Sequence, residues 1–213
     1  MLVEYKTVLK EAETTIIEKK SKFIAQVKPV TTQEEAEEFL SLVRKTHYSA
    51  THNVPAYIIG KNGEIQKASD DGEPSGTAGM PMLEVLKSLE LVDVVVVVTR
   101  YFGGTLLGRG GLIRAYGKAA KAGVLAAGVV RMVPHNQVKL TVDYGIMGKV
   151  QNELINMGIE IKNVEYFTDV TFEILILPED CDRVHEVVQN LTADQFSWII
   201  EQQVYVAKHE DVV

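Results

Sequence analysis

The stretch that decides the fold covers residues 94–120 and reads VVVVVTRYFGGTLLGRGGLIRAYGKAA. Its β-branched beginning is apolar at every position, which predicts a central strand that is buried on both faces. A glycine-rich turn follows, and the residues from about Arg109 to Ala127 then have the pattern of a helix. Leu112, Tyr116 and Gly123 fall on one side of that helix, so we expect this side to pack closely on a sheet.

The same turn and helix also have the properties of an anion site. Glycines at a helix start leave backbone N–H groups open to an anion. Arg114, Lys118 and Lys121 recur at i, i+4 and i+7 and therefore share one helix face. Residues 94–142 contain basic side chains and no acidic one, although the net charge of the chain is −7. We predict a nucleic-acid or anion site here. Its candidate residues are Arg100, Gly103, Gly104, Gly108, Arg109, Gly110, Gly111, Arg114, Lys118 and Lys121. The alternative, glycines used for packing and cations forming a solvated face, stays open.

A second loop, SDDGEPSGTAG at 69–79, is dense in residues that break regular structure. Its candidate residues are Asp70, Asp71, Glu73, Ser75 and Gly76. The carboxylates could hold a divalent cation, with His47 and His52 upstream, or could simply form an acidic turn. The spacing matches no zinc motif, no P-loop and no dinucleotide fingerprint, so we expect no metal and no cofactor.

The rest of the chain divides into two expected domains, 1–132 and 133–213, with a boundary where Pro134 interrupts. The first begins with a hairpin or one bent strand over 3–30, followed by a helix capped by Thr31 or Thr32. A hairpin turns at Asn62-Gly63, and a helix covers about 78–89. The second domain alternates as βαββαβ, the ferredoxin-like order. The net charge is +2 for the first expected domain and −9 for the second.

Composition and segment patterns bear on where the protein works. Cys181 is the single cysteine, so no internal disulfide can form. No apolar run approaches the length of a membrane span, and residues 1–15 do not resemble a secretory signal. We therefore expect a cytoplasmic protein with no membrane partner.

The two loops together resemble the signature of the IMPACT family, in its bacterial YigZ/YvyE type. The similar segments are SDDGEPSGTAGMP (69–81), residues 94–120 and KTHYSATHNVPAYIIG (45–60). Val54 stands where we would expect a cysteine or similar residue. Residues 138–206 resemble the domain that bacterial members append, which is similar to the last domain of translation elongation factor G.

The resemblance implies an α+β fold. It comprises an N-terminal αβ domain of the ribosomal-protein-S5-domain-2-like class and a C-terminal ferredoxin-like domain. It also implies a role in translation regulation and stress response. We expect a regulator that binds RNA or a ribosomal surface, with the acidic C-terminal domain facing a possible protein partner. Two alternatives are a metal- or phosphate-dependent hydrolase, since some relatives carry a peptidase label, and a protein-interaction scaffold. The residues themselves define no reaction and no catalytic group.

Overall fold

The computed structural model describes residues 3–210 and divides them into two compact units. The N-terminal unit comprises residues 4–132 together with 207–210, and the C-terminal unit comprises 133–206 together with Val3. Within the described residues, no helix is both long and apolar enough to cross a membrane. The fold is α+β, as the sequence predicts.

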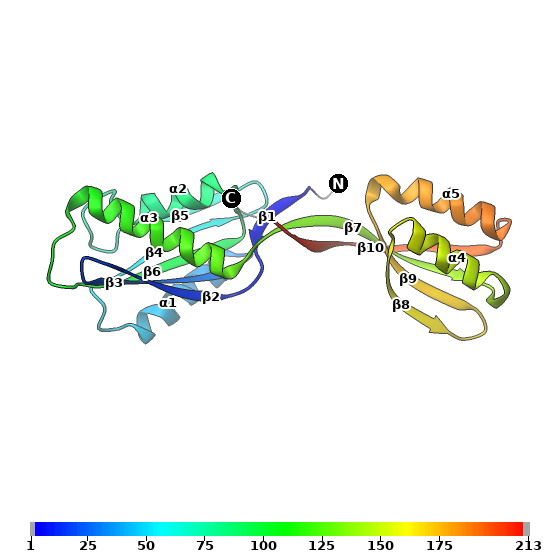
Figure 1. The fold of residues 1–213 in the computed structure, drawn as a ribbon, viewed down its shortest axis with the longest axis horizontal. Helices are drawn as coiled ribbons and strands as arrows, with labels where there is room; N and C mark the ends of the chain where they lie inside the picture. Colours follow the sequence, from blue (N-terminus) through cyan, green and yellow to red (C-terminus); the bar gives the residue numbers. More distant parts are fainter. Residues whose placement is uncertain (1–2, 211–213) are drawn as a thin grey trace. The chain divides into compact units, whose positions relative to one another are not determined.

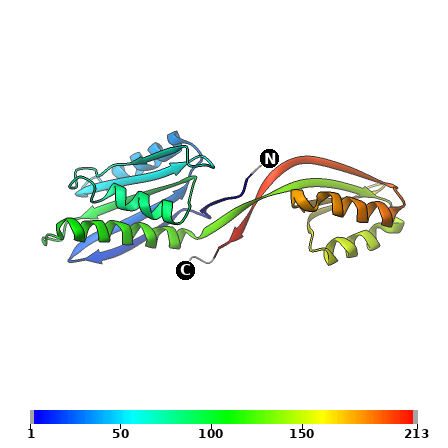
Figure 2. The same cartoon turned by 90° about the horizontal axis from the view of Figure 1, so that it is seen from above.

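The N-terminal unit is an antiparallel sheet in the order β2-β3-β6-β4-β5, covered by helices on both faces (Figure 1). The strands are β1 (Tyr5–Val8), β2 (Ala12–Glu18), β3 (Ser21–Pro29), β4 (His52–Ile59), β5 (Ile65–Ala68) and β6 (Val94–Tyr101). The helices are α1 (Gln33–Thr46), α2 (Gly79–Ser88) and α3 (Gly108–Ala127). Figure 2 shows α2 and α3 side by side along the sheet, and α1 packs on the opposite face.

The β6 strand is the centre of this sheet, as its sequence predicts. Val94 to Val98 are fully buried, and alternate residues contribute to the cores on the two faces. On one face α3 comes very close to β3, because a Cβ at Gly123 would lie 2.8 Å from Val27 Cγ2. Glycine is therefore required at Gly123 by the closeness of helix and sheet.

The segment 3–30 forms three strands rather than one bent strand. The β2 and β3 strands pair as a hairpin over the turn residues Lys19 and Lys20, while β1 pairs with the start of β7. Thr32 caps α1, where its Oγ1 accepts a hydrogen bond from the Glu35 N–H at 3.2 Å. This satisfies one of the N–H groups that a helix start leaves open.

The C-terminal unit has the predicted βαββαβ order. Its elements are β7 (Val129–Val142), α4 (Tyr144–Asn156), β8 (Glu160–Tyr166), β9 (Val170–Ile176), a 3₁₀ turn η1 (Pro178–Asp180), α5 (Cys181–Thr192) and β10 (Phe196–His209). The strand order is β10-β7-β9-β8, and the buried sides of the strands pack under α4 and α5 around Phe172. This arrangement is ferredoxin-like.

Contrary to the expectation from the sequence, Pro134 does not interrupt the chain, because β7 runs through it. Residues 129–132 of β7 pair with β1, and residues 136–142 pair with β9. Pro134 falls between these two paired segments, where its missing N–H costs no hydrogen bond to either strand.

Candidate nucleic-acid interface

The two glycine-rich loops meet in the N-terminal unit through one buried carboxylate. Glu73, from the 69–79 loop, accepts hydrogen bonds at its Oε1 from Arg100 Nη1 at 2.5 Å and from the Tyr116 hydroxyl at 2.8 Å. Arg100 is the penultimate residue of β6 and Tyr116 lies in α3, so Glu73 ties the loop to both elements. Burial and the neighbouring Glu73 charge raise the pKa of Tyr116, which stays a neutral donor.

Asp70 organises the same loop by accepting backbone hydrogen bonds. The N–H groups of Gly76, Ala78 and Gly79 donate to its carboxylate at 2.8–3.0 Å, just where α2 begins. Partial burial alone would raise the pKa of Asp70, but these hydrogen bonds and the Arg109 charge hold that pKa below its usual value. The N-cap position of α2 is Ala78, which has no capping side chain, so Asp70 takes over that task from the loop and accepts hydrogen bonds from the N–H groups at the helix start.

Asp71 also bonds within the protein. Its Oδ2 accepts from the Asn53 N–H and its Oδ1 from Arg44 Nη2, both at 2.7 Å. Its carbonyl lies 2.7 Å from His52 Nδ1, and His52 Nε2 lies 3.7 Å from Glu73 Oε1. Among residues 3–210, no group of three or more His, Cys, Asp or Glu is arranged to hold a metal ion. Asp70, Asp71 and Glu73 all accept hydrogen bonds from within the N-terminal unit.

Arg100 lies in the interior, apart from the exposed cations with which the sequence grouped it. Only 5% of its surface is exposed, and its guanidinium lies between the rings of Phe23 and Phe102, at 5.5 and 5.6 Å. Its position follows from strand parity, since Arg100 points to the same face as Val96 and Val98, which pack in the core under α2 and α3. Arg100 therefore has a structural contact, its ion pair with Glu73, in the interior of the N-terminal unit.

The basic face of α3, by which we mean Arg114, Lys118 and Lys121, is exposed as predicted. In the described part of the chain, none of the three forms an ion pair. Arg114 and Lys118 line a hollow of about 260 Å³ together with Glu18 and Lys19 from the β2–β3 hairpin. The hollow therefore has three cations and one carboxylate around it.

The lysines of the hairpin turn extend this basic surface, and no pattern in the sequence indicated them. Lys19 and Lys20 have φ values of 44° and 68°, the left-handed pair that a two-residue hairpin turn needs and that Asn-Gly usually supplies. Backbone of this kind is strained for a lysine, and such strain often occurs at functional sites. A Cβ on Gly103 would lie 2.0 Å from the Lys20 carbonyl carbon, so Gly103 lets the turn sit directly against the 102–107 loop.

The remaining predicted residues lie around the start of α3. Gly104 and Gly108 have positive φ, and Gly110 and Gly111 lie in the first turn of the helix. Arg109 Nη2 donates to the Ser75 carbonyl at 2.9 Å, which joins this turn to the 69–79 loop a second time. All of the predicted loop residues thus belong to one region of the N-terminal unit.

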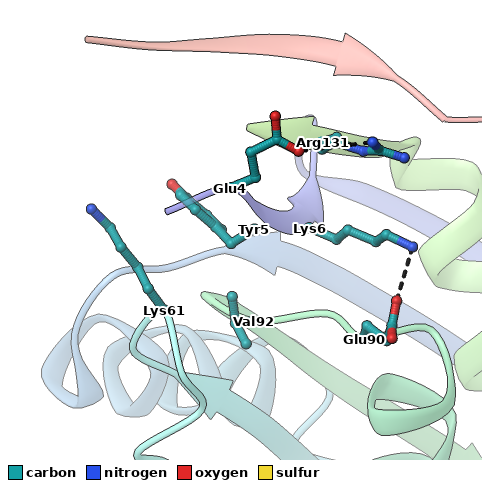
Figure 3. A pocket seen from close by; sticks show the side chains of 7 residues that line it. All are labelled: Glu4, Tyr5, Lys6, Lys61, Glu90, Val92 and Arg131. Carbon is teal, nitrogen blue, oxygen red and sulfur yellow. Dashed lines mark hydrogen bonds and ion pairs between the residues drawn. The ribbon is translucent and has the colours of Figure 1, made fainter. Parts of the chain in front are cut away.

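A second hollow, of about 320 Å³, lies near β1, where carboxylates pair with Lys6 and Arg131 (Figure 3). Lys6 Nζ lies 3.0 Å from Glu90 Oε2 and 3.2 Å from Glu210 Oε2. Arg131 is ion-paired with Glu4 and Glu210. An anion entering there would have to displace these carboxylates, which makes the basic face of α3 the better candidate.

The geometry therefore defines a two-unit α+β protein with an exposed basic helix beside two interlocked loops. Residues 19–124 match the family described as the Impact N-terminal domain, and residues 140–195 match the one described as a domain of unknown function (DUF1949). The chain belongs to the IMPACT family.

Three known proteins show how far this similarity extends. The IMPACT family member YvyE of Bacillus subtilis is 46% identical over 192 residues, which is 90% of this chain and 88% of that protein. YigZ of Escherichia coli is 35% identical over 156 residues, 68% of this chain and 76% of the relative. A crystal structure described as that of a hypothetical protein superposes with a TM-score of 0.60 at 26% identity, covering 95% of this chain and 99% of the other.

Proposed function

We propose that this protein is a translation-associated regulator that binds RNA phosphates through the basic face of α3 and the adjoining Lys19. The observation that carries the proposal is the hollow in which Arg114 and Lys118 face Lys19 without a balancing ion pair on α3. Surface helices ordinarily mix charges of both signs to gain i,i+4 pairs, whereas α3 has four cations and no carboxylate. The link to translation rests on the family resemblance.

The charge pattern favours a polyanion over a small anion. Lys121 lies seven residues beyond Arg114, so it lies about 10 Å further along the helix axis. One phosphate cannot reach both ends of such a row, while a chain of phosphates can contact each cation in turn. Four phosphate contacts, including Lys19, give a salt slope of about −3 for single-stranded RNA.

The test is filter binding of RNA over a salt series with two charge-matched variants. Arg114→Glu/Lys118→Glu reverses two charges in the hollow. Lys149→Glu/Lys162→Glu reverses two exposed lysines of the C-terminal unit, and within the described residues neither of these lysines forms an ion pair. We expect the first variant to lose binding and its salt slope, and the second to bind as the wild type does. An equal loss of RNA binding in both variants would show that binding depends on the net charge of the protein and not on the basic face of α3. If neither the wild type nor the variants bind RNA at low salt, the proposal is refuted.

A further inference from the structure

Two exposed aromatic side chains lie on segments of the N-terminal unit that hydrogen bonds join to each other. Tyr48, in the connection between α1 and β4, is 87% exposed, and Phe102, directly after β6, is 47% exposed. The Thr51 N–H donates to the Arg100 carbonyl at 2.9 Å, and the Phe102 N–H donates to Thr51 Oγ1 at 3.1 Å. These hydrogen bonds hold the turn that carries Tyr48 against the chain that carries Phe102.

The aromatic pair is continuous with the proposed phosphate site. Gly103 follows Phe102 and lies directly against the backbone of Lys20, while Lys19 lines the hollow with Arg114 and Lys118. In Figure 1 the β2–β3 turn and the loop from β6 to α3 lie at the same end of this unit. A bound chain leaving the hollow therefore passes the two lysines of the turn and next meets Phe102.

Phe102 is held in place from beneath. The Arg100 guanidinium carbon lies 5.6 Å from the centre of its ring, and Arg100 is itself fixed by Glu73. A cation against an aromatic face attracts the ring and orients it. Nearly half of the surface of Phe102 still faces solvent, so the ring that Arg100 orients remains accessible to a ligand.

From this arrangement we infer that the ligand is single-stranded RNA, whose unpaired bases stack on Phe102 and Tyr48 while its phosphates follow the cations. The inference rests on the proposed function and adds the class of RNA. In a duplex the bases are stacked on each other and cannot reach aromatic side chains, whereas splayed bases of single strands stack on them. Exposed aromatics next to a row of cations are the combination that single-strand binders use.

The experiment compares three RNA probes of equal phosphate number on the full chain: a ten-nucleotide oligo(A), the same length made abasic, and a duplex. We expect oligo(A) to bind at least about tenfold more tightly than the abasic strand, because the stacking of two bases on two aromatic side chains together supplies at least that much. Phe102→Leu/Tyr48→Leu should lose this advantage and keep the weaker binding of the other two probes. The matched control, Tyr166→Leu/Phe167→Leu, removes two exposed aromatics of the C-terminal unit and should change nothing.

The outcomes separate the inference from the proposed function. If the wild type binds all three probes equally with a steep salt slope, the phosphate site stands and the stacking inference is wrong. Binding of none of the probes at low salt would overturn both. If circular dichroism shows that Phe102→Leu disturbs the fold, the single variant Tyr48→Leu decides, because the Tyr48 side chain is almost fully exposed. Unchanged binding of oligo(A) by Tyr48→Leu then refutes stacking at Tyr48. A loss of binding confined to oligo(A) supports it.

Discussion

The buried pair Arg100–Glu73 makes a strong prediction about stability. In Arg100→Met, the Glu73 carboxylate, whose side chain is 3% exposed, keeps the Tyr116 hydroxyl as a donor but loses its counter-charge. Removing one partner of a buried ion pair typically costs about 3–5 kcal/mol, because the remaining charge stays buried and uncompensated. We expect the free energy of unfolding of the N-terminal unit to fall by about this amount.

The assay must report on the N-terminal unit alone. Native-state hydrogen exchange of the β6 amides does so, because these amides lie at the centre of its sheet. The single tryptophan, Trp198, is partly buried against the C-terminal core and gives a fluorescence reference for the other unit. A two-state fit to the whole chain would mix the two units and is therefore avoided.

The same experiment can refute the reasoning. Glu73→Gln and the double variant with Arg100→Met complete a double-mutant cycle, in which residues in contact show a coupling of about 0.5–3 kcal/mol. We expect the loss of unfolding free energy in the double variant to be smaller than the sum of the losses in the two single variants. A loss below about 1 kcal/mol in Arg100→Met, or strict additivity in the cycle, would show that solvent reaches the pair and screens it.

Three further predictions follow from the packing and the charges. Gly123→Ala should destabilise the N-terminal unit by about 1–3 kcal/mol, since its Cβ would lie 2.8 Å from a β3 side chain. Gly117→Ala in the same helix should stabilise the unit by about 0.5–1 kcal/mol, since its Cβ meets nothing nearer than 4.0 Å. Thermal unfolding of both variants checks the contrast, and equal effects would contradict it. Asp70→Ala should cost about 0.5–2 kcal/mol at pH 7. Because the pKa of Asp70 is lowered in the folded state, its contribution is present above its ordinary pKa and is lost as the pH falls through the folded value. Urea unfolding measured from pH 7 to pH 3 should therefore show the free energy of unfolding of the wild type falling toward that of Asp70→Ala. A difference between the two that stays constant over this range would exclude the mechanism. Glu18→Gln should tighten RNA binding in filter assays, since it removes the carboxylate that lines the hollow beside Lys19, and weaker binding would argue against phosphate there.

Periodicity predicted most of the fold because burial imposes it locally. The apolar run at 94–98 and the alternating strands of the C-terminal unit carry their own pattern, so the central strand and the βαββαβ order are confirmed. Pairing between distant segments has no such local signal. The contact of β1 with residues 129–132, and the hydrogen bond from the Glu210 N–H to the Val129 carbonyl, could not be read from the sequence.

The candidate site was predicted only in part, for a related reason. Helical spacing placed Arg114, Lys118 and Lys121 on an exposed face, which the structure confirms. Arg100 was grouped with them by charge, although its parity with the buried valines of β6 already indicated the interior. Lys20 and Tyr48 were missed because they lie in turns, where side chains have no periodic pattern to follow.

Packing and binding are often weighed as alternatives for a glycine-rich segment, but in the site proposed here the first is the condition for the second. Gly103 has no room for a side chain, and the group that occupies the space is the backbone of the hairpin turn. Any larger residue would push Lys19 and Lys20 away from the loop and from Phe102. A glycine that serves only packing thus sets the distance between the cations of the turn and the aromatic platform.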